Sequence, residues 1–124
     1  MVFTATLSNP VDVDVTVDFA TSDGTATIGD NDYTATTQKL TFTKGGPLTQ
    51  TINVPIVGDT NVETDETFNV ALSNLQASGR NVTLGVAQTG TIVDDDSNLP
   101  TASVSDVTLV EGNAGTTAFV FTIT

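Results

Sequence analysis

Residues 11–19 read VDVDVTVDF, and apolar and polar side chains alternate along this stretch. In an extended chain the apolar residues from Val13 to Phe19 lie on one face, and Thr16 and three aspartates lie on the other. A half-buried β-strand requires this period of two, whereas an amphipathic helix requires a period of 3.6. We therefore predict a strand here, and we interpret its aspartates as solvated residues that guard a sheet edge, not as metal ligands.

The same alternation recurs along the chain, so the sequence predicts an all-β fold. Further apolar runs of this period occupy residues 40–42, 52–56, 68–72, 104–109 and 119–123. Threonine is frequent between them, which suits a pleated surface, and turn signals such as Asp23-Gly24 and Gly45-Gly46-Pro47 separate the runs. Seven or eight short strands at this spacing are typical of an immunoglobulin-like antiparallel β-sandwich.

Composition excludes several classes of function. The 124 residues suffice for about one domain, and 15 acidic against 3 basic residues give a formal net charge of −12. Such a charge repels nucleic acid and anionic lipid surfaces, and no apolar run approaches the ~18 residues of a membrane span. Because the chain has no cysteine or histidine, disulfides, thiolate or imidazole metal sites and the usual nucleophile–base pairs are excluded. Any metal site in this chain must therefore be formed by oxygen ligands.

Three adjacent aspartates, Asp94, Asp95 and Asp96, directly follow the strand-like run GTIV. Their charges repel one another unless a cation lies among them. Calcium takes six to eight oxygen ligands in irregular geometry and is served well by carboxylates. The segment is either a calcium-ligating loop or an acidic linker.

The two ends of the chain resemble each other. Residues 2–6 read VFTAT and residues 120–124 read VFTIT, so that Phe3 and Phe121 lie 118 positions apart. One period cut from a tandem array, with the cut inside a repeat, would give this pattern.

Four segments together resemble the Calx-beta repeat. They are DGTATIGDNDYTATTQKLTF, VPIVGDTNVETDETFNVALSN, GTIVDDD and, after these, VSDVTLVEGNAGTTAFVFTIT. That family includes the regulatory calcium-binding domains of sodium/calcium exchangers and tandem modules of bacterial surface proteins. A family repeat normally opens with the segment that comes last here, so the order resembles a circular permutation.

The resemblance implies calcium ligands in loops at one end of the sandwich. Asn61 would offer a backbone carbonyl, and the implied carboxylate ligands are Asp23, Asp59, Glu63, Glu66, Asp94, Asp95, Asp96 and Glu111. Family members often carry an acidic residue at the position of Gly58, so fewer or weaker ion sites are expected here.

Several acidic residues have an alternative interpretation. Asp23 precedes a glycine and could instead be a turn residue that caps its own loop. Asp65 is interpreted as solvent-facing. Asp30 and Asp32 are interpreted as acceptors for backbone N–H groups that order their loop, with Tyr33 packed beneath them.

The permuted order predicts a division of the chain into three parts. Residues 1–96 would form the body of one module that lacks its first strand, 97–100 a linker, and 101–124 the first strands of the following module. First and last strands of such a sandwich run parallel, so the linker, which reaches about 14 Å, cannot easily span a strand about 20 Å long. We expect residues 101–124 to be donated to a neighbouring copy, where Glu111 would complete the calcium site. The alternatives are an excerpt of a longer polypeptide, or ends that fold back.

The expected function is that of a calcium-binding structural and adhesive repeat module of an extracellular or cell-surface protein. Calcium would rigidify the junctions between repeats, the partners would be neighbouring copies in head-to-tail order, and an adhesion ligand is a further partner. The alternative is a regulatory calcium sensor, as in sodium/calcium exchangers. An enzyme is not expected: paired carboxylates can hydrolyse glycosides, but the chain has no tryptophan to bind sugar and calcium would neutralise those groups.

Overall fold

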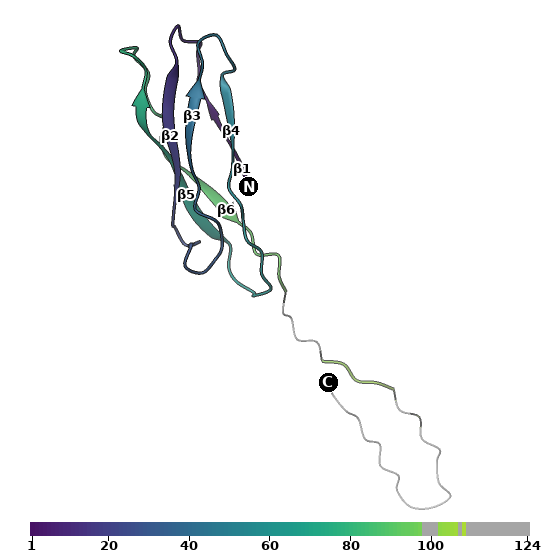
Figure 1. The fold of residues 1–124 in the computed structure, drawn as a ribbon. Coiled ribbons are helices and arrows are strands. Elements are labelled where there is room, and N and C mark those ends of the chain that lie inside the picture. Colours follow the sequence, from purple (N-terminus) through teal and green to yellow (C-terminus); the bar gives the residue numbers. More distant parts are fainter. Residues whose placement is uncertain (98–101, 107, 109–124) are drawn as a thin grey trace, which may run out of the picture.

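The computed structural model describes residues 1–97, 102–106 and 108. Six strands within residues 1–97 form two antiparallel β-sheets that face each other (Figure 1). The smaller sheet pairs β1 (Val2–Thr6) with β4 (Thr49–Asn53). The larger sheet has the order β3-β2-β5-β6, formed by β3 (Thr37–Phe42), β2 (Val15–Ser22), β5 (Glu66–Gln76) and β6 (Gln88–Ile92). The arrangement confirms the expected all-β sandwich, with six strands in the described residues. No helix in that part of the chain could span a membrane.

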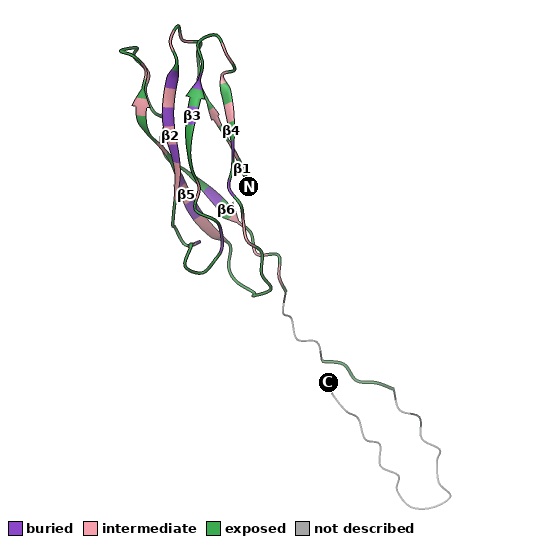
Figure 2. Ribbon diagram, viewed as in Figure 1, coloured by how far each residue is buried: buried purple, intermediate pink, exposed green. Residues whose placement is uncertain are grey.

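The core consists of the apolar positions of the alternating pattern. Val15, Val17 and Phe19 of β2 are all buried, and they meet the buried residues of the other strands between the sheets (Figure 2). Fully buried partners include Leu40, Ile52, Val54 and Phe68. Of the expected strand at 104–109, residues 104–106 and 108 are described, and they are exposed and belong to none of the six strands; the expected strand at 119–123 lies outside the described residues.

The strand predicted at residues 11–19 lies a few residues later in the chain, at Val15–Ser22, and is not an edge strand. β2 begins at Val15 and pairs with β3 on one side and β5 on the other. The aspartates of residues 11–19 are exposed or half-buried, and two of them bind basic side chains: Asp18 lies 3.0 Å from Lys39 Nζ, and Asp12 accepts two hydrogen bonds from Arg80. The predicted face was therefore correct and the predicted edge was wrong.

Strand direction determines which loops meet. β4 and β6 both run toward the end of the sandwich that carries residues 56–66 and 93–96, where β5 begins. β1 is antiparallel to β4, so it starts near that end and runs away from it. The described chain also leaves the sandwich at this end, after β6 (Figure 1).

Candidate metal centre

Three segments converge at the end of the sandwich toward which β4 and β6 run. They are the β2–β3 loop, the segment between β4 and β5, and the residues that follow β6. Together they line an open cavity of about 260 Å³. We call it the acidic cavity, because seven carboxylates line it: Asp32, Asp59, Glu63, Glu66, Asp94, Asp95 and Asp96.

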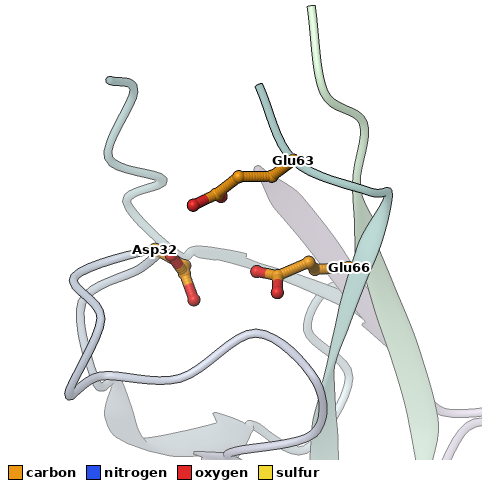
Figure 3. A group of neighbouring side chains, drawn as sticks. All are labelled: Asp32, Glu63 and Glu66. Carbon is orange, nitrogen blue, oxygen red and sulfur yellow. The ribbon is translucent and has the colours of Figure 1, made fainter. Parts of the chain in front are cut away.

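Asp32, Glu63 and Glu66 form the tightest group in this cavity. Each offers one carboxylate oxygen, and these oxygens lie within 4.8 Å of one another, with the side chains directed toward a common point (Figure 3). Asp32 is 8% exposed, and its Oδ2 accepts a hydrogen bond of 2.7 Å from the backbone N–H of Thr27. Glu66 is the first residue of β5, so the sheet fixes its position.

The segment after β6 is tied to the β4–β5 segment by hydrogen bonds between backbone and carboxylates. Glu63 N donates to Asp94 Oδ2 at 3.0 Å, and Asp94 N donates to Asp65 Oδ1 at 3.2 Å. Asp96 N donates in turn to Asp94 Oδ1 at 3.1 Å. These bonds place the three aspartates at the cavity although the segment is not part of a strand.

The electrostatics of the cavity favour a cation. Partial removal from water, followed by the charges of nearby aspartates, raises the pKa of Glu63, of Glu66 and of Asp96. The chain has 3 basic residues, and none of them lines the cavity. Each raised pKa therefore reflects partial desolvation first and, after it, like charges that no side-chain cation offsets.

Seven of the nine residues implied as ligands line the acidic cavity: Asp59, Asn61, Glu63, Glu66, Asp94, Asp95 and Asp96. Asp23 does not line it. Its Oδ1 accepts hydrogen bonds from the Tyr33 hydroxyl at 2.6 Å and from Ile28 N at 3.1 Å, which corresponds to the alternative role in its own loop. Glu111 lies outside the described residues.

Asp32 is the cavity residue that sequence reasoning did not assign as a ligand. It was expected only to order its loop, and it does accept the bond from Thr27 N. Its carboxylate also faces Glu63 and Glu66, more than thirty residues later in the chain. The available signal was the adjacent Tyr33, whose ring stacks on Phe68 with the ring centroids 4.5 Å apart, so that the β2–β3 loop lies beside the start of β5.

The donor set fits calcium. All side-chain donors are oxygens, and two oxygens bound to one calcium ion at 2.3–2.6 Å lie at most about 5 Å apart. The 4.8 Å limit for Asp32, Glu63 and Glu66 falls within that distance. Loop segments supply most of the other carboxylates, which suits an ion that tolerates irregular coordination.

Comparison with known proteins shows similar domains. A family model described as Calx-beta domain matches residues 1–97. The crystal structure of the apo-form Calx CBD1 domain is similar with a TM-score of 0.60 and 29% sequence identity, over 68% of this chain and 73% of that one.

Two further solved structures are similar over 77% of this chain. The calcium binding domain CBD12 of CALX1.1 gives a TM-score of 0.65 at 27% identity, and CBD12 from CALX1.2 gives 0.68 at 26% identity. The matches cover only 40% and 38% of those chains. No curated protein matches the sequence.

Proposed function

Since the chain belongs to the Calx-beta family, whose domain model matches residues 1–97, we propose that it is a module that binds calcium in its acidic cavity. The observation that carries the proposal is the group of Asp32, Glu63 and Glu66, whose oxygens lie within 4.8 Å of one another with no basic side chain at the cavity. These three carboxylates would hold one ion. Asp59 and the three aspartates after β6 line the rest of the cavity and would hold a further ion.

Bound calcium would act as a cross-link between three segments. It would neutralise the repulsion among the carboxylates and join the β2–β3 loop, the β4–β5 segment and the residues after β6. The last of these segments leads out of the sandwich toward the remainder of the chain. An ion at this position stiffens the exit from one module, which is where a following module begins.

We infer from this position a structural role in an extracellular or cell-surface protein built of repeated modules, with adhesion as its purpose. The similar sequences at residues 2–6 and 120–124 support the repeat context. The net charge of −12 is also compatible with a surface exposed to high calcium. The second candidate is a regulatory calcium sensor, and the likeness to the calcium binding domain of CALX1.1 favours it.

Calorimetric titration of calcium into the full chain tests the proposed binding. We expect heat of binding for the unaltered protein and a loss of at least tenfold in affinity for the double variant Asp32→Asn, Glu66→Gln. The matched control is Asp12→Asn, Asp14→Asn, which removes the same charge from outside the acidic cavity. Equal titration curves for the unaltered protein and the cavity variant would refute the assignment of the site.

Hydrogen exchange distinguishes the structural role from the sensor role. A junction-stiffening ion protects residues 58–66 and 93–97 and leaves the rest of the sandwich unchanged. A sensor transmits the conformational change at its calcium site to other parts of the domain. Protection from hydrogen exchange would then also change at the opposite end of the sandwich, in residues 77–87. Exchange that calcium leaves unchanged at every segment would contradict both roles.

A further inference from the structure

Strand β1 has one edge without a partner strand in the described part of the chain. Met1 and Val54 exchange both backbone hydrogen bonds, at 2.7 and 2.8 Å, and Leu7 N donates to Leu48 O at 2.8 Å. In an antiparallel pair the hydrogen-bonded positions alternate, so the odd-numbered residues of β1 use their backbone groups toward β4. The N–H and C=O groups of Val2, Thr4 and Thr6 consequently face the open edge.

The open edge borders an apolar groove between the two sheets. Phe3, Ala5 and Ile52 line it from the smaller sheet, and Phe19, Val70 and Leu72 line it from the larger sheet. The cavity there measures about 110 Å³, and Val86, which also lines it, is 83% exposed. The described strands leave β6 as the nearby edge of the larger sheet, because β6 pairs with β5 alone. As far as the described strands go, the sandwich is therefore open along one side.

We propose that this side accepts residues 102–110 of a second copy of the chain as an added strand. The segment reads ASVSDVTLV, in which Val107 and Leu109 lie two residues apart and so share one face of an extended strand. Backbone groups of β1 supply hydrogen bonds, and the groove supplies pockets for the apolar side chains, as in other cases of strand addition. The inference goes beyond calcium binding and does not require it.

Strand direction favours a second copy over the chain's own tail. A strand added antiparallel to β1 must begin beside Thr6, at the end of the sandwich remote from the acidic cavity. The chain leaves its own body beside the cavity, and residues 98–101 extend at most about 14 Å. β1 alone, with its five residues, is about 16 Å long, so residues 98–101 are too short to run back along it. The further distance from the end of β6 to β1 adds to this shortfall. A neighbouring molecule placed head to tail has no such restriction.

Two variants separate the acceptor surface from the donated strand. Thr4→Pro removes an N–H that faces the open edge and keeps the bonds to β4, so it blocks acceptance; Thr4→Ser is its control. Leu109→Asp places a charge in the donated segment, which contributes to none of the six described strands. Circular dichroism reports whether the proline variant remains folded.

Sedimentation velocity of the full chain in chelator tests the proposal. The unaltered protein forms a concentration-dependent series of oligomers, and each variant alone loses all species above the monomer. A mixture of the two variants forms dimers and nothing longer, because one partner retains only the acceptor and the other only the donor. A monomeric unaltered protein at all concentrations, or a Leu109→Asp chain that assembles normally, overturns the proposal. Calorimetry on the monomeric variant reports calcium binding separately, so the two proposals can fail independently.

Discussion

Asp23 and Asp32 lie in the same loop, and their surroundings give them different roles. The carboxylate of Asp23 accepts hydrogen bonds from the Tyr33 hydroxyl and from the Ile28 N–H, so it stabilises its own loop. Asp32 is buried, keeps one oxygen on Thr27 N and faces two glutamates from another segment. A position in the sequence does not reveal this difference, because it depends on which way each side chain leaves the backbone.

Substituting these two aspartates by asparagine is expected to separate stability from calcium binding. Asp23→Asn weakens the charged hydrogen bond to Tyr33 and lowers the free energy of unfolding by about 1–2 kcal/mol, with calcium affinity nearly unchanged. Asp32→Asn removes a charge from the acidic cavity and lowers calcium affinity by about tenfold or more. Calorimetry and urea unfolding measure the two quantities. A larger affinity loss for the Asp23 variant would reverse the assignment.

Gly90 provides a second test at the scale of the single residue. It is buried in β6 against Phe68, and a Cβ added there would lie 2.6 Å from the ring Cζ. Gly90→Ala is expected to destabilise the fold by about 1–3 kcal/mol through overpacking, measured by urea unfolding. Gly85→Ala is the matched control, since no atom lies within 4 Å of its added Cβ. Equal effects of the two variants would contradict the close packing.

The sequence allowed most of the candidate site to be predicted, and the omissions have physical causes. Clustered acidic residues before β5 and after β6 indicated an ion site, and the structure gathers them. Asp32 was not assigned because the glutamates that its carboxylate faces, Glu63 and Glu66, lie more than thirty residues later in the chain. Such contacts leave no periodic signal.

At the scale of elements, the periodicity of two determined which faces are buried but not which strands are neighbours. The segment that leads into β2 and the strand itself carry alternating aspartates typical of an edge, yet β2 has an inner place in its sheet, between β3 and β5. It tolerates them because they lie on the solvent face, where Asp18 binds Lys39 and Asn74. Sheet order results from the connections among all strands, and a single strand pattern does not contain it.

Calcium is expected to reverse the pH dependence of stability. Because the pKa values of Glu63, Glu66 and Asp96 are raised, their protonation stabilises the metal-free fold. That contribution is fully present below the ordinary values of 4.5 for glutamate and 3.8 for aspartate, and it is lost as pH rises through the raised values. The metal-free protein should therefore become more stable on acidification from pH 7 toward 4.5, whereas the calcium-loaded protein should become less stable.

Thermal unfolding with calcium and with chelator, across this pH range, measures both trends. At neutral pH, calcium at a hundred times its dissociation constant adds about 2.7 kcal/mol per site, which raises Tm by roughly 10 °C. Measurements stay above pH 4.5, because the lowered pKa values of Asp12 and Asp18 make stability fall again in stronger acid. Parallel pH trends with and without calcium would contradict binding at the raised carboxylates.

At the scale of the whole molecule, the acidic cavity and the open side of the sandwich lie so that one added strand could reach both. The described chain leaves the sandwich beside the cavity, and a strand added antiparallel to β1 would end at the same place. The residue that follows the proposed donated strand is Glu111. A neighbour's strand would thus deliver one more carboxylate to the cavity, so calcium binding and assembly would be linked.

This linkage predicts that calcium strengthens assembly through Glu111 of the donating copy. In sedimentation equilibrium the unaltered chain should associate about tenfold more tightly with calcium than with chelator, because the donated carboxylate adds an oxygen ligand only in the assembled state. Glu111→Gln should keep the association seen in chelator and lose most of the gain from calcium. Asp106→Asn, which removes a charge from the same segment at a distance from its end, is the control and should retain the gain. If the glutamine variant still gains tenfold, the added strand does not reach the cavity, and calcium acts on assembly only by stiffening the acceptor.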